Sequence, residues 1–166
     1  MGQARISKSD SKQNKRRQKR SSTIKGTASP KRRVRKAQVK YLTWDLATAA
    51  IQVAKGLPTE SLERVRDSLA LSKKEFASVI QISERTMTRR KRERLLPPDE
   101  SDRVFRFARL VELAASVLGS EDGATEWMKE PNYALGHRSP LEFAKTEPGA
   151  VLVENLLGRI DHGIPV

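Results

Sequence analysis

Cysteine and long apolar runs are both missing from this sequence of 166 residues. Without cysteine the chain has neither disulfide bonds nor thiolate metal sites, which fits the reducing conditions of a cytoplasm. No apolar run approaches the roughly 18 residues that a membrane-spanning helix needs. The basic N-terminus is followed by no apolar stretch, so it lacks the pattern of a secretory signal. We therefore expect a cytoplasmic protein with no membrane partner.

Residue patterns that are typical of catalysis are missing as well. The two histidines, His137 and His162, are not spaced as a metal-binding pair on a helix, and there is no HExxH motif. The sequence contains no GxSxG nucleophile motif and no phosphate-binding glycine loop. We expect no enzyme activity, no metal and no cofactor.

Positive charge is distributed unevenly along the chain. Residues 1–40 contain 15 Lys and Arg against a single acid, whereas residues 41–166 contain 18 against 19 acids. Within the second part, residues 83–95 hold six basic residues and two acids, and residues 96–166 hold seven and twelve. The two basic regions are suited to phosphate groups, and the acidic half is suited to a protein partner.

The basic tail, residues 1–40, has too few large apolar residues to offset the entropy lost on ordering, so we expect it to be disordered in isolation. Its basic clusters include Lys31, Arg32 and Arg33. We expect these side chains to add non-specific DNA affinity through the release of counterions. A purely solubilising tail is the alternative.

The rest of the chain shows helical periodicity and no alternation of period two, so the predicted fold is all-α. A short helix is predicted over residues 43–54, with Leu46, Ala50 and Val53 facing the core. Gly56 is placed to end this helix.

The second half of the chain contains strong signals for helix starts and ends. Two prolines followed by acids at residues 97–100 predict the start of a long helix, which Gly119 ends. This helix is apolar on most of its surface, so we expect it to be central and largely buried. Ser120, Ser139 and Thr146 are placed to cap three further helices.

Residues 72–92 show the helix-turn-helix pattern, two short helices joined by a three-residue turn. Ser72 and Glu75 form a capping box at the first helix, and Ser83 caps the second. The turn position held by Gln81 requires positive φ, which costs a non-glycine residue on the order of 1 kcal/mol.

The second helix of this pair is the predicted DNA reader. Once Ile82 and Met87 face inward, basic and hydroxyl side chains face outward, where arginine can read guanine and threonine can touch phosphate or a thymine methyl group. A unit of this kind is expected to bind operator DNA as a homodimer, with half-sites about one helical turn apart. A solvated basic helix in a protein-interaction domain is the alternative. The predicted DNA-binding residues of this helix are Arg85, Thr88, Arg89 and Arg92.

Seven stretches of the sequence form a pattern that is specific in order and spacing. They are residues 71–77, 82–86, 98–103, 127–132, 134–136, 139–142 and 157–163. In this pattern the chain resembles the Xre/MbcA/ParS family of antitoxins. The resemblance begins near Gly56 and covers about two thirds of the chain, and it does not include the basic tail or the residues around Trp44.

The resemblance implies an antitoxin in the cytoplasm of a bacterium, whose cognate toxin is of the RES type that degrades NAD⁺. It also implies that the C-terminal helix and tail block the entrance of the toxin active site. Arg159 is, by position, the candidate for a direct contact there, because a guanidinium can pair with a carboxylate. Apolar helix surface that the core does not use should add binding energy. The candidate toxin-binding residues are Leu156, Arg159, Ile160 and His162.

We therefore predict an Xre-like helix-turn-helix domain over residues 41–96 and a small helical toxin-binding domain over residues 97–166. The predicted function is that of an antitoxin which neutralises its toxin by direct binding and represses its own operon. A stand-alone dimeric transcriptional regulator, whose acidic half serves only dimerisation, is the alternative.

Overall fold

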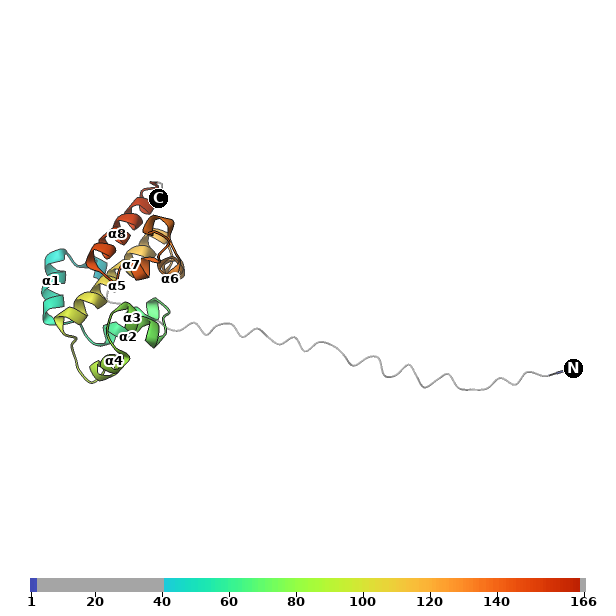
Figure 1. The fold of residues 1–166 in the computed structure, drawn as a ribbon, viewed down its shortest axis with the longest axis horizontal. Coiled ribbons are helices and arrows are strands. Elements are labelled where there is room, and N and C mark those ends of the chain that lie inside the picture. Colours follow the sequence, from blue (N-terminus) through green and yellow to red (C-terminus); the bar gives the residue numbers. More distant parts are fainter. Residues whose placement is uncertain (3–40, 165–166) are drawn as a thin grey trace. The chain divides into compact units, whose positions relative to one another are not determined.

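The structure is a computed structural model that describes residues 1–2 and 41–164 (Figure 1). The predicted disorder of the basic tail therefore lies outside the described residues, apart from the first two. The described part contains helices and no strand, which confirms the all-α prediction. The elements are η1 (Tyr41–Thr43), α1 (Leu46–Lys55), α2 (Glu60–Ser68), α3 (Lys73–Val79), α4 (Glu84–Arg90), α5 (Pro98–Leu118), α6 (Glu121–Lys129), η2 (Tyr133–Leu135), α7 (Pro140–Phe143) and α8 (Glu147–Asp161).

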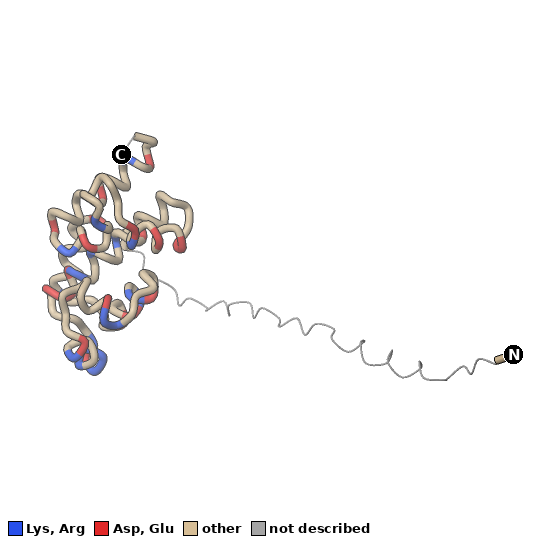
Figure 2. The backbone as a smooth tube through the Cα atoms, turned by 45° about the vertical axis from the view of Figure 1, so that its right-hand side comes forward, with Lys and Arg blue, Asp and Glu red and all other residues tan. Residues whose placement is uncertain are grey.

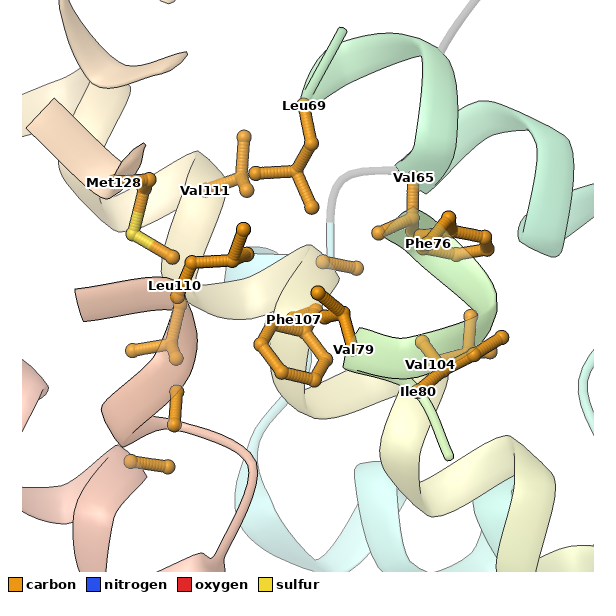
Figure 3. Packing of buried hydrophobic residues seen from close by; sticks show 14 of the residues in the cluster. Val65, Leu69, Phe76, Val79, Ile80, Val104, Phe107, Leu110, Val111 and Met128 are labelled. Carbon is orange, nitrogen blue, oxygen red and sulfur yellow. The ribbon is translucent and has the colours of Figure 1, made fainter. Parts of the chain in front are cut away.

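Helix α5 is the centre of the fold, as its apolar surface predicts. Its length follows from the N-terminal Pro98 and from Gly119, which ends it in the left-handed conformation with φ 73°. Helices α1, α2, α6 and α8 and the short η1 all pack against α5. Figure 3 shows side chains from α2, α3, α5 and α6 converging in one apolar cluster. The central helix therefore carries both halves of the chain in a single core.

The predicted capping residues start most of the helices. Ser72 and Glu75 form the complete capping box at α3, with amide-to-side-chain distances of 3.2 and 2.8 Å. Ser120, Ser139 and Thr146 each accept a hydrogen bond from a backbone amide in the first turn of α6, α7 and α8. Because these side chains satisfy the otherwise unpaired amides at each start, helix boundaries here follow directly from the sequence.

Helix α1 exists, but the prediction of its inward face is wrong. Leu46 is 80% exposed and Ala50 is also exposed, while Val53 is half-buried and Ala49 is the fully buried residue. The residues of this helix are apolar on nearly all sides, so periodicity alone does not define one face. Asp45, which accepts the Thr48 amide, marks where the helix begins, and packing against α5 selects the side that is buried.

An aromatic cluster attaches the start of this segment to α5. Tyr41 lies edge-on to both Trp44 and Phe105, with ring centroids 5.1 and 5.6 Å apart, and Trp44 stacks on Phe105. The Tyr41 hydroxyl also shares a buried hydrogen bond of 3.0 Å with Ser61 of α2. These contacts join η1, α2 and α5.

The predicted division between residues 96 and 97 stays a prediction. Helix α5 begins directly after residue 97. It packs against α1 and α2, which precede this division in the sequence, and against α6 and α8, which follow it. Among the residues that the structure describes, no helix is long and apolar enough to span a membrane.

Candidate functional site

The turn between α3 and α4 has the geometry that the sequence predicts. Gln81 adopts φ 54°, the left-handed conformation expected at this position. The Ile82 amide reaches back to the Ala77 carbonyl over 3.0 Å, so the chain reverses immediately after α3. Ile82 and Met87 are both buried, as predicted for the apolar anchors. Residues 73–90 therefore form a helix-turn-helix.

The outer face of α4 carries the predicted DNA-reading side chains. Ser83 caps this helix by accepting the Thr86 amide. Burial of Met87 turns the opposite side of the helix to solvent, and Figure 2 shows basic residues gathered at the end of the protein that α4 occupies. The exposed side chains on this face are Arg85, Thr88 and Arg89. The prediction that Arg92 belongs to the same helix is wrong, because α4 ends at Arg90 and Arg92 is an exposed residue of the turn that follows.

Two of these residues make contacts within the protein. The Thr88 hydroxyl donates to the Glu84 carbonyl over 2.9 Å and accepts from Lys73 Nζ over 3.4 Å. Arg89 remains 65% exposed and lies 3.9 Å from Glu93, the outer limit of an ion pair. Neither contact withdraws its side chain from the surface.

Arg90 behaves differently from its basic neighbours. Its guanidinium donates to both carboxylate oxygens of Glu100 over 2.8 and 2.7 Å, and to Glu93 over 2.6 Å. Glu100 and then Glu93 raise the pKa of Arg90 above its ordinary value. Both Arg90 and Glu100 are largely buried, with exposed side-chain fractions of 14% and 8%.

This pair was not predicted from the sequence, because Arg90 stands in a run of basic residues and Glu100 among first-turn acids. The signal that could have identified Arg90 is its place three residues after Met87, which puts it on the inward side of α4. The tail residues Lys31, Arg32 and Arg33 lie outside the described residues.

The second candidate surface is the outer face of α8. Its exposed side chains are Val151, Leu152, Asn155 and Arg159, a set that we call the α8 stripe; His162 continues it at the end of the helix. Leu152 is 51% and Val151 is 44% exposed, so the stripe combines apolar groups with one guanidinium.

The four candidate toxin-binding residues do not share one environment. Arg159 and His162 are exposed, and Ile160 is half-buried against the core. Leu156 is only 4% exposed, so the core uses the apolar surface that it was expected to offer to a toxin. Arg159 and Ile160 lie within the helix rather than in a tail, because α8 continues through Gly158 to Asp161.

The stripe residues Val151 and Leu152 were missed as surface groups. Their exposure follows from helical phase. The inward side of α8 is defined by buried or half-buried residues that recur every three or four positions, namely Val153, Leu156, Leu157 and Ile160, and Val151 and Leu152 therefore point outward.

Ion pairs fix α8 on the central helix. Arg109 pairs with Glu154, and Arg106 lies 2.8 Å from Glu147 and 2.7 Å from Asp102. Burial raises the pKa of Glu154 above its ordinary value, although Arg109 opposes the shift. The outer face of α8 is therefore presented by a helix that is held at its first turn and its middle.

Within the described residues, no group of three histidine or acidic side chains is arranged to hold a metal ion.

Two families of known domains match consecutive parts of the chain. Residues 49–109 match the antitoxin Xre-like helix-turn-helix domain, and residues 113–163 match the antitoxin Xre/MbcA/ParS C-terminal toxin-binding domain. The first match contains α3, α4 and their turn, and the second contains α6 to α8.

Similar proteins carry the same name. The chain is 34% identical over 111 residues to Antitoxin Xre of Yersinia enterocolitica, and 35% identical over 111 residues to Antitoxin Xre of Photorhabdus laumondii. Each alignment covers 66% of this chain and 75% of the relative. Antitoxin Xre of Pseudomonas putida is 33% identical over 76 residues, which are 46% of this chain and 48% of that protein.

A solved structure shares the fold. A chain of the crystal structure of the M. tuberculosis MbcT-MbcA toxin-antitoxin complex superposes with a TM-score of 0.52 and 24% sequence identity, covering 65% of this chain and 96% of that one. The named relatives are antitoxins, a family of regulators and toxin binders without enzymatic activity. The chain belongs to this Xre/MbcA/ParS family of antitoxins, with an Xre-like helix-turn-helix domain followed by a toxin-binding domain.

Proposed function

We propose that this antitoxin neutralises a RES-type, NAD⁺-degrading toxin by direct binding and represses its own operon through the outer face of α4. The observation that carries the first part is the α8 stripe, which the fold leaves exposed on a helix fixed to α5. Exposed apolar side chains around one guanidinium are suited to a protein partner, because aliphatic groups supply buried area and arginine supplies orientation.

In this proposal α8 docks at the entrance of the toxin active site. Leu152 and Val151 supply the apolar contact together with the accessible part of Ile160, and Arg159 pairs with a carboxylate in the cleft. His162 lies at the end of the helix, next to Asp161 at 3.6 Å, where the chain would enter the cleft. Leu156 supports this surface from within the core.

DNA binding is assigned to the exposed residues of α4 and of the turn that follows it. Arg85, Thr88, Arg89 and Arg92 read base edges or hold phosphates in the major groove of an inverted repeat in the antitoxin's own promoter. A homodimer presents two copies of α4 to the two half-sites, within the cytoplasm of a bacterium. The basic tail, including Lys31, Arg32 and Arg33, adds affinity that does not depend on sequence.

The toxin arm is tested by co-expression of the antitoxin with the toxin encoded beside it, while cellular NAD⁺ is measured. The full chain is expected to preserve NAD⁺, and a chain truncated after Leu157 is expected to fold, bind operator DNA and protect poorly. Arg159→Glu, which keeps the whole helix, is expected to reduce protection as well. Full protection by both variants would exclude the end of α8 as the inhibitory element.

The DNA arm is tested by titrating the promoter fragment with the unaltered chain and with an Arg85→Ala/Arg89→Ala variant. Loss of the two arginines is expected to weaken specific binding by about 1–3 kcal/mol for each base contact removed. A Lys55→Ala/Lys145→Ala variant removes the same charge away from α4 and should bind almost normally. Equal operator affinity of the arginine variant and the unaltered chain would exclude α4 as the reader.

The same two assays distinguish the proposed function from the alternative one. A stand-alone transcriptional regulator would bind its operator as a dimer and leave NAD⁺ unprotected at any level of expression.

A further inference from the structure

Two helices of the helix-turn-helix half end in a strained turn that lacks glycine. After α2, Ala70 adopts φ 45°, and after α3, Gln81 adopts φ 54°. The left-handed conformation at this position is normally taken by glycine, because other residues clash there. Each turn therefore needs stabilisation from outside its own helix.

The turn after α3 is bound by a side chain of α5. Nη1 of Arg103 donates to the carbonyls of Ile80 and Gln81 over 3.2 and 2.9 Å. These are carbonyls at the end of a helix, which have no partner within the helix itself. A charged donor is especially effective here, since it also interacts favourably with the negative end of the helix dipole.

Arg103 is itself held in place. Its Nε donates to the Asp99 carbonyl over 3.1 Å, and Nη2 lies 2.5 Å from the Asp99 carboxylate. The guanidinium is therefore fixed on α5 while its remaining nitrogen reaches the turn.

The turn after α2 is bound in a similar way from α6. Lys129 Nζ donates to the Ala70 carbonyl over 2.9 Å, and the Thr125 hydroxyl donates to the Ser68 carbonyl over 2.7 Å. Both turns are thus stabilised in the same way: a cationic side chain from the second half of the chain donates hydrogen bonds to carbonyls at the end of a helix. They differ in the helix to which each turn leads, since Ala70 leads into α3, whereas Gln81 leads directly into α4.

Side chains of α5 bind both ends of helix α4. Arg103 holds the turn before it, and Glu100, three residues earlier and therefore on the same side of α5, holds Arg90 in its last turn. The helix is only seven residues long, so small rotations at these two points redirect its whole outer face.

From this geometry we infer that Arg103 is a positioning residue for DNA reading, which orients α4 by fixing the backbone of the turn that precedes it. The inference rests on the proposed DNA-binding function. Arg103 acts through backbone carbonyls and not by touching DNA. Its role therefore differs from that of Arg85 and Arg89, whose side chains would meet the bases.

The experiment compares Arg103→Met with Lys129→Met in the full chain. Both variants remove a cation that binds a helix end, and both should lower the melting temperature. Arg103→Met is expected to lose about tenfold in affinity for the promoter repeat, because a loosely oriented α4 must be ordered before its side chains can meet the bases, with little change for unrelated DNA. Lys129→Met is expected to keep the ratio of specific to non-specific affinity, and Arg103→Lys is expected to recover part of the lost ratio.

A second variant separates positioning from simple stabilisation. Gln81→Gly relieves the strained φ, so adding it to Arg103→Met should restore the melting temperature while operator affinity stays low. Full recovery of operator affinity in that double variant would overturn the inference, as would an unchanged ratio in Arg103→Met alone. Failure of the unaltered chain to bind its promoter repeat would instead overturn the proposed DNA-binding function, and the inference with it.

Discussion

The outer faces of α4 and α8 are the two proposed surfaces for partners, and their side chains differ in chemistry. The α4 face is formed by Arg85, Thr88 and Arg89, with Arg92 in the turn that follows, and it has no large apolar side chain. The α8 stripe has two exposed aliphatic residues and the single cation Arg159. The first suits a polyanion and the second suits a protein surface.

The two faces are also supported in different ways. Inward from the α4 face, the buried Met87 is joined by an ion pair, in which Arg90 is neutralised by Glu100 and Glu93. Inward from the α8 stripe, it uses aliphatic side chains such as Leu156 and Leu157. A short basic helix has few apolar side chains that can attach it to the core. An inward-facing arginine that pairs with carboxylates therefore helps to attach it. This difference can be tested by substitutions on the inner and outer sides of each helix.

The largest effect is expected within α8, where Leu156 and Leu152 have the same side chain but opposite exposures, 4% and 51%. Leu156→Asp leaves an unpaired carboxylate in the core and should destabilise the fold by about 4 kcal/mol. Leu152→Asp should leave the melting temperature nearly unchanged and weaken toxin binding by about 1 kcal/mol or more.

Thermal denaturation together with a pull-down of the toxin distinguishes the two leucine variants. Wild-type toxin binding by Leu152→Asp would show that the outer face of α8 is not the contact surface.

A slightly smaller loss is expected for the buried pair beneath α4. Glu100→Ala removes two of the three hydrogen bonds of Arg90 and should cost about 3 kcal/mol, since the guanidinium is left largely buried with Glu93 alone. Glu93→Ala is the control, because that carboxylate is 39% exposed and should cost less than about 1 kcal/mol. Similar urea midpoints for the two variants would contradict the assignment of Glu100 as the principal partner.

The elements whose ends are marked by side chains could be predicted from the sequence. Ser72, Glu75 and Gly119 determine helix boundaries through local contacts, so no knowledge of the rest of the fold is needed. The outward face of α4 also follows from local phase once Met87 is placed inside.

The features that could not be predicted depend on contacts between distant residues. The role of Arg103 is one of them, because its partners Ile80 and Gln81 lie more than 20 positions away. The prediction of the buried face of α1 was wrong for the same reason. Because this helix has apolar residues on nearly all sides, only its packing on α5 decides that Ala49 is buried and Leu46 is not. Neither outcome has a signal in the local sequence.

The two sources of positive charge, α4 and the basic tail, can be compared in the same way. Removing residues 1–40, which hold 15 Lys and Arg, should lower affinity for unrelated DNA by about tenfold at moderate salt. It should also flatten the dependence of log affinity on log salt, because fewer counterions are released. Operator preference should remain, since we assign it to α4. A full-length chain with Lys31, Arg32 and Arg33 changed to Gln is expected to lie between the two, and an identical salt slope for all three proteins would exclude the tail from DNA binding.

The smallest effect is expected at the start of α3, where Ser72 caps the helix that supports the turn. Ser72→Ala removes the acceptor of the Glu75 amide and should cost about 1 kcal/mol, whereas Ser78→Ala, at an exposed position of the same helix, should cost almost nothing. The Ser72 side chain and then its backbone amide, through hydrogen bonds with the carboxylate, lower the pKa of Glu75 in the folded chain. Because the pKa is lower in the folded chain, the ionised carboxylate stabilises the fold at pH values above the pKa of the unfolded chain, which is about 4.3. This contribution is lost as the pH falls through the pKa of the folded chain. Melting temperatures of wild type and Glu75→Gln should therefore differ at pH 7 and converge toward pH 3, and a gap that stays constant over this range would show that the carboxylate charge plays no part in the cap.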